Sequence, residues 1–149
     1  MNAVGIDVSK GKSMIVVMRP LGEVVAVPFE VGHTAAELDE LARFILKIDG
    51  ETRVIMEYTG SYYEPIAYAL HEVGLYVSTV HAQLIHDFGN NTIRKVKTDK
   101  ADSMKIAAYG LAKRKTLLFL HDSRFCKILA HLLRPCQRKL EQLGGKHLS

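Results

Sequence analysis

The 149-residue sequence has no tryptophan, only four prolines and no long apolar run. A helix that crosses a bilayer needs about 20 consecutive, mostly apolar residues, so the composition excludes a protein built on membrane-spanning helices. The first residues also lack the basic start and apolar stretch of a secretory signal peptide. We therefore expect a cytoplasmic protein.

Cysteine is nearly absent as well, and this argues against a zinc site or a disulfide-rich domain. Cys126 and Cys136 are ten residues apart, with no Cys or His partner at zinc-site spacing. His81 and His86 are five apart, which does not match the i, i+4 spacing of a zinc-binding helix. We expect two free thiols, and structural or surface roles for the seven histidines.

What is present suits one globular domain with a basic second half. Hydrophobic residues make up 48% and charged residues 24%, with a net charge of +4. Most acidic residues lie before residue 90, whereas lysine and arginine recur from Arg94 onward. This asymmetry favours a polyanionic partner such as nucleic acid. The alternative is a basic helix face that only contacts solvent.

The stretch GIDVSKGKS allows two interpretations. A P-loop needs four residues between its first glycine and the Gly-Lys-Ser/Thr, and it opens a helix. Here five residues separate Gly5 from Gly11, and the apolar run after Ser13 is typical of a strand. The spacing therefore favours a β-hairpin that carries Asp7, with Lys10-Gly11-Lys12 as its turn.

The apolar pattern predicts an α/β protein with a mixed five-stranded sheet flanked by helices. Three strands in meander order come first and are expected to be antiparallel, with Pro28 placing the third toward an edge. Strands alternating with helices follow, which adds parallel pairing. The predicted strands are 3–8, 13–19, 24–30, 52–58 and 75–80, with one helix after Thr34 and another over 61–74. This order resembles the ribonuclease H-like fold, in which the first strand lies beside the fourth.

Two of these strands end in a carboxylate. Asp7 follows the apolar run AVGI, and Glu57 follows VIM and precedes a Thr-Gly turn. A carboxylate at the end of an apolar strand is costly unless it has partners. If the first and fourth strands are neighbours about 4.8 Å apart, the two carboxylates can meet. The alternative is a pair of harmless acids at exposed strand ends.

A second acidic pair opens a predicted helix. Asp99 and Asp102 are three residues apart after the N-cap candidate Thr98, so they share one helix face. Acids in a first turn also interact favourably with the helix dipole, which is the simpler explanation. Convergence with Asp7 and Glu57 would instead give four carboxylates, the ligands that Mg²⁺ prefers. The neighbouring basic residues are candidates for nucleic-acid phosphate contacts: Arg94, Lys95, Lys97 and Lys100.

Three stretches resemble one known family: GIDVSK, VIMEYTGSYYEPIAYALHEVGLYVSTV and IRKVKTDKADSMKIAAY. They are similar to the N-terminal, RuvC-like domain of the DEDD-type transposases of bacterial insertion sequences. The resemblance implies Mg²⁺- or Mn²⁺-dependent cleavage and transfer of DNA strands in transposition, with a guide RNA as partner. It also implies that the four acids are catalytic metal ligands, at Asp7, Glu57, Asp99 and Asp102.

The family pattern assigns residues 1–120 to the catalytic domain and 121–149 to a helical extension. Family members continue into a second domain with a nucleophilic serine, for which this sequence has no counterpart. An inactive, nucleic-acid-binding remnant is therefore an alternative function. An actin-like ATP-binding module is another, although it requires a glycine-rich turn after Asp7. The apolar stripe of residues 125–134 predicts a homo-oligomer held together through this helix.

Overall fold

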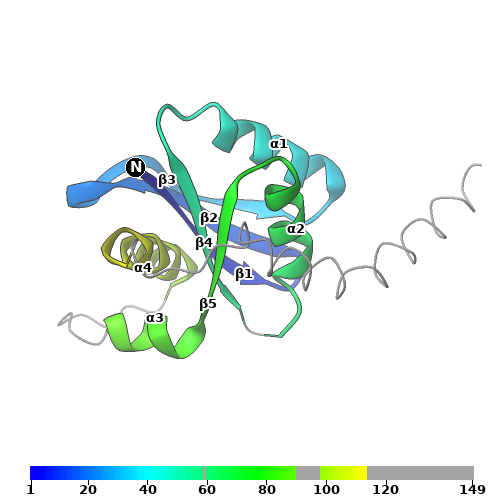
Figure 1. Cartoon of the computed structure of the whole chain (residues 1–149). Coiled ribbons are helices and arrows are strands. Elements are labelled where there is room, and N and C mark those ends of the chain that lie inside the picture. Colours follow the sequence, from blue (N-terminus) through cyan, green and yellow to red (C-terminus); the bar gives the residue numbers. More distant parts are fainter. Residues whose placement is uncertain (59, 90–97, 114–149) are drawn as a thin grey trace, which may run out of the picture.

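A computed structural model describes residues 1–58, 60–89 and 98–113. Its centre is a five-stranded sheet in the order β3-β2-β1-β4-β5 (Figure 1). β1 pairs with β2 and β2 with β3 in antiparallel fashion, whereas β1 with β4 and β4 with β5 are parallel. The predicted mixed sheet is confirmed, including the neighbouring positions of the first and fourth strands. The strands are Asn2–Ser9, Lys12–Arg19, Glu23–Gly32, Thr52–Tyr58 and Tyr76–His81.

The first two strands settle the question raised by GIDVSKGKS. β1 and β2 form a hairpin in which Ser9 pairs with Lys12 across a Lys10-Gly11 turn. Gly11 has a φ of 76°, a value that glycine adopts without steric cost. No helix follows this turn, because the chain continues directly into β2. The hairpin prediction is confirmed, and the P-loop alternative is excluded.

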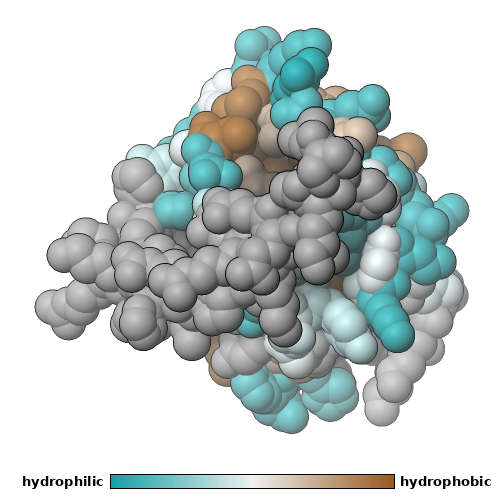
Figure 2. Space-filling model, turned by 90° about the vertical axis from the view of Figure 1, so that its right-hand side faces the viewer, coloured by the Kyte–Doolittle hydropathy of each residue, from teal (hydrophilic) through white to brown (hydrophobic). Residues whose placement is uncertain are grey.

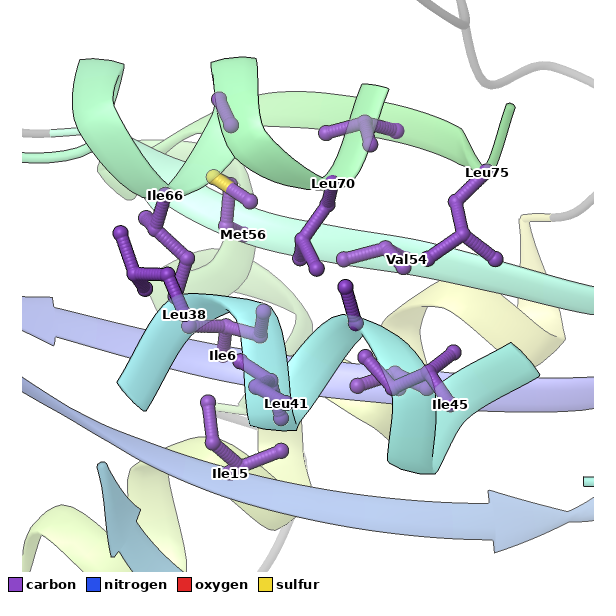
Figure 3. Packing of buried hydrophobic residues seen from close by; sticks show 14 of the residues in the cluster. Ile6, Ile15, Leu38, Leu41, Ile45, Val54, Met56, Ile66, Leu70 and Leu75 are labelled. Atoms are coloured by element: carbon purple, nitrogen blue, oxygen red, sulfur yellow. The ribbon is translucent and has the colours of Figure 1, made fainter. Parts of the chain in front are cut away.

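One face of the sheet is covered by α1 (Ala35–Leu46) and α2 (Glu64–Glu72) (Figure 1). Alternate strand residues point to this face because side chains alternate along a strand. Figure 3 shows helix and strand side chains interlocking there, among them Ile6, Ile15, Leu41, Met56 and Leu70. Ile6, Ile15, Met56 and Leu70 are completely buried. This is the larger of the two apolar layers of the sheet.

Local signals explain where these two helices begin. The hydroxyl of Thr34 accepts a hydrogen bond from the Glu37 N–H at 3.3 Å, as the predicted N-cap requires. In a standard capping box the Glu37 carboxylate would accept a hydrogen bond from the N–H of Thr34. Here it accepts instead from the N–H of Gly32, two residues earlier. α2 carries Pro65 in its first turn, where the missing N–H has no helical partner to lose.

The opposite face carries α3 (Ala82–Gly89) and α4 (Asp99–Ala112). α3 is an addition to the predicted elements, since the pattern after the fifth strand did not indicate it. A smaller apolar layer joins these helices to the sheet through Val16, Ile55, Val80, Ile85 and Ile106, among others. β3 is an edge strand of the sheet, which agrees with the position of Pro28 in it.

Two glycines let α4 lie directly on the sheet. A Cβ atom added to Gly5 of β1 would lie 2.6 Å from the backbone nitrogen of Ala107, and it would also meet the carbonyl oxygen of Ser103. A Cβ added to Gly110 would lie 2.5 Å from Cγ1 of Ile55 in β4. α4 is therefore in near-backbone contact with β1, which fixes the direction and height of its first turn.

Among the described residues, no helix is long and apolar enough to cross a membrane. Figure 2 shows a face that is mostly hydrophilic where it is described, with one hydrophobic area near the top. Among the described residues the most exposed large apolar side chain is Leu21, in the β2–β3 connection, where its φ is 67°. The predicted helix over residues 125–134 lies outside the described residues.

We predict that Gly5→Ala lowers the free energy of unfolding by about 1–3 kcal/mol, the usual cost of overpacking. The added methyl group meets backbone atoms of α4, which cannot rotate away. Gly110→Ala is the comparison variant, because its methyl meets only the side chain of Ile55 and the substitution also gains helix propensity of about 1 kcal/mol, so a smaller loss is expected. Urea denaturation of both variants measures the difference. An equal effect of the two substitutions would contradict the close packing at Gly5.

Candidate functional site

Asp7 and Glu57 lie at the carboxyl ends of neighbouring parallel strands. The register pairs Gly5 with Ile55 and Ile6 with Met56, so the next residue of each strand carries a carboxylate at the same level. Gly5 and Ile55 face α4. Because side chains alternate along a strand, Asp7 and Glu57, two residues further on, lie on the same face. Both side chains are half-buried. The structure thus brings the two strand-end acids together on one face of the sheet.

The first turn of α4 brings Asp102 to the same place. Thr98 caps the helix by accepting a hydrogen bond from the Ala101 N–H at 3.1 Å, as the sequence predicted. Because Ser103 lies over Gly5, the residues before it lie beside the strand ends. Asp102 is half-buried and within electrostatic reach of Glu57. Asp99 is the first residue of α4, but the position of its side chain is outside the described set.

The pKa of Glu57 is shifted by its surroundings. Burial raises the pKa of its carboxyl above the ordinary value, and the negative charge of Asp102 raises it further. The positive charge of Lys105 acts in the opposite direction, as does the His81 ring in its protonated form. Desolvation and the second carboxylate together outweigh the two basic groups, so the pKa of Glu57 is raised overall.

Two residues of this site were missed by sequence reasoning. Lys105 was not singled out, although its position three residues after Asp102 places both on one helix face. His81 was expected to be structural, yet it ends β5 and pairs with Tyr58, one residue after Glu57. The signal for His81 is topological, because ligands of α/β sheets gather at the carboxyl ends of parallel strands. His81 Nδ1 accepts from the Gln83 N–H at 3.1 Å, which orients the ring.

The donor set fits a hard divalent cation. Carboxylate oxygens are the ligands that Mg²⁺ takes up in proteins, commonly one or two together with substrate phosphate. The raised pKa of Glu57 beside Asp102 shows carboxylates that repel one another and that a cation would relieve. In the described ranges, from which the Asp99 side chain is missing, no group of three or more His, Cys, Asp and Glu side chains is arranged to hold a metal. A complete ligand set therefore stays a prediction.

The predicted phosphate contacts are only partly covered by the structure. Lys100 is exposed in the first turn of α4, on the side of the sheet that carries Asp7 and Glu57. Arg94, Lys95 and Lys97 lie outside the described residues. These four contacts remain predictions.

Comparison with known proteins agrees with this geometry. The model of the IS110-type DEDD family, described as "Transposase", matches residues 4–143, which is nearly the whole chain. No curated protein matches the sequence.

Two solved structures are similar in fold. RuvC of T. thermophilus in complex with a Holliday junction substrate has a TM-score of 0.56 at 14% identity, covering 80% of this chain and 99% of that one. The Thermus thermophilus RuvC structure has a TM-score of 0.50 at 16% identity, covering 80% of this chain and 100% of the other. At these identities the likeness shows a RuvC-like, ribonuclease H-like fold, as the sequence predicted.

We predict that Glu57→Gln raises the melting temperature of the metal-free protein at neutral pH by about 1–3 °C, a value reduced for the partial exposure of the group. The folded state binds the Glu57 proton more tightly than the unfolded state, whose ordinary pKa is 4.5. Stability is therefore lost as pH rises from that value through the raised folded pKa. The difference between the variant and the parent should vanish below about pH 4.

Scanning calorimetry in the presence of a chelator, repeated across this pH range, measures the effect. Glu40→Gln is the matched control, because Glu40 is an exposed glutamate of α1 on the opposite face of the sheet. A variant that melts lower than the parent at neutral pH would contradict the crowding of Glu57 with Asp102.

Proposed function

The chain belongs to the IS110-type DEDD transposase family, and on that premise we propose that it cleaves and transfers DNA strands with the help of divalent metal ions. The observation that carries the proposal is the placement of Asp7 and Glu57 at neighbouring strand ends, with Asp102 in electrostatic reach of Glu57. Acids so arranged are costly to fold. Metal-dependent chemistry gives a physical reason for their presence.

We assign the metal to Asp7, Glu57, Asp99 and Asp102, with Mg²⁺ or Mn²⁺ as the ion. Bound metal ions stabilise the attacking and leaving oxygens of an in-line phosphodiester displacement. The residues of this chain would hold the ions and exclude bulk water from one side of the site, where β1, β4 and α4 meet. The half-buried state of Asp7, Glu57 and Asp102 supports such a partly enclosed position.

DNA is the proposed substrate, and branched DNA is a suitable probe because the similar RuvC structure contains a Holliday junction. Arg94, Lys95, Lys97 and Lys100 are the proposed phosphate contacts. A guide RNA as partner, and a homo-oligomer through residues 125–134, follow from the resemblance and the apolar pattern of the sequence. Residues 125–134 lie outside the described residues.

We predict that saturating Mn²⁺ raises the melting temperature of the parent chain by roughly 3–5 °C, because the ion binds only the folded state. Asp7→Asn should abolish most of this rise while leaving the metal-free protein folded. Glu40→Gln, which neutralises an exposed acid of α1, should keep the full rise. If Mn²⁺ does not stabilise the parent chain, the proposed metal site is wrong.

Strand cleavage is tested separately on a labelled four-way junction with Mg²⁺ or Mn²⁺. Loss of one metal-binding carboxylate removes several kcal/mol of transition-state stabilisation, so Asp7→Asn should reduce the rate by at least about 100-fold. Binding of the junction without cleavage by the parent chain would favour the alternative of a nucleic-acid-binding protein without chemistry.

A further inference from the structure

One flank of α4 faces the carboxyl ends of the parallel strands. Tyr109 packs against Phe88 of α3 with the rings perpendicular and 5.4 Å between centroids, so this flank is turned toward α3. Lys105 precedes Tyr109 by four residues and follows Asp102 by three, so the three side chains lie in one row. α3 begins directly after β5, the strand beside β4. Lys105 therefore lies between α3 and the end of β4.

Lys105 differs from the other lysines of this helix. Lys100 and Lys113 are exposed, whereas Lys105 is half-buried. Its charge reaches Glu57, yet among the described residues no carboxylate lies within the 4.0 Å of an ion pair with it. A lysine that served only to neutralise Glu57 or Asp102 would be expected to pair with one of them. Its three N–H donors are instead available to a further anion.

An anionic phosphodiester needs such a donor at this site. Like charges a few ångströms apart repel more strongly at a partly buried site than in bulk water. A phosphate that approaches Glu57 and Asp102 meets this repulsion before any cation is counted. A lysine on a flexible four-carbon stem, held at the edge of the acidic cluster, offsets part of it and fixes one side of the phosphate.

We propose that Lys105 is a substrate-binding residue whose Nζ donates a hydrogen bond to a non-bridging oxygen of the DNA phosphodiester positioned at Glu57 and Asp102. This inference rests on the proposed function, because it names the group that holds the DNA at that same site. No bond is made or broken by the lysine. Its contribution is present before the chemical step, so it is measurable as DNA binding without metal.

The test measures binding of a fluorescently labelled four-way DNA junction to the whole chain in the presence of a chelator, over a range of salt concentrations. Lys105→Ala should weaken binding about fivefold to tenfold and should lower the slope of log K against log salt by about one, as expected for the loss of one phosphate contact. Lys105→Arg should restore both quantities. The matched control is Lys47→Ala, since Lys47 is an exposed lysine that caps α1 on the opposite face.

A purely structural role gives a different result. If Lys105 only balances the acidic cluster, Lys105→Ala lowers the melting temperature and leaves the salt slope unchanged, and that outcome overturns the inference. Failure of the proposed function is seen elsewhere, as the absence of Mn²⁺ stabilisation and of cleavage in the parent chain. If the parent chain cleaves DNA and the Lys105→Ala variant binds and cleaves as well as the parent does, the proposed role of Lys105 is wrong. The proposed function is then unaffected.

Discussion

The candidate site depends on the contact between α4 and the backbone of β1. At Gly5 the helix lies so near the strand that a single methyl group would meet the backbone at Ser103 and Ala107. This contact fixes the first turn of α4 against the ends of β1 and β4. With a side chain at Gly5, the helix would have to move outward, and Asp102 would move away from Glu57. The position of a carboxylate thus follows from the absence of a side chain in a neighbouring strand.

The two faces of the sheet carry different demands. The α1 and α2 face is an uninterrupted apolar layer in which Ile6, Met56 and Leu70 are fully buried, and burial of this kind stabilises by about 25 cal/mol per Å². The α4 face has a smaller apolar layer and ends in the acidic cluster. Repulsion between carboxylates lowers the free energy of unfolding, and burial in the larger apolar layer offsets this cost.

Much of this arrangement could be predicted from the sequence, and the remainder could not for a definable reason. Strand alternation, turn glycines and the Thr34 and Thr98 caps are local signals, and they gave the strands and the start of two helices. The sheet order came from the likeness of the element order to the ribonuclease H-like fold. The adjacency of the first and fourth strands followed from topology, which the register confirms, and it puts Asp7 and Glu57 at neighbouring strand ends. Helix α3 and the placement of Lys105 and His81 depend on contacts distant in sequence, such as Phe88 with Tyr109. No local pattern encodes those contacts.

The arrangement also explains why acidic and basic groups share one site. Burial and the negative charge of Asp102 raise the pKa of Glu57 although Lys105 is within electrostatic reach, so this lysine alone does not offset them. Basic side chains that fully neutralised the acids would leave no attraction for metal ions. Without any basic side chain, the acids would repel the DNA phosphate. Under the proposed function, one half-buried lysine beside Glu57 and Asp102 meets both requirements, because it attracts the phosphate locally and leaves carboxylate oxygens for a metal ion. The composition of the site then suits two ligands of opposite charge, a metal ion and a DNA phosphate.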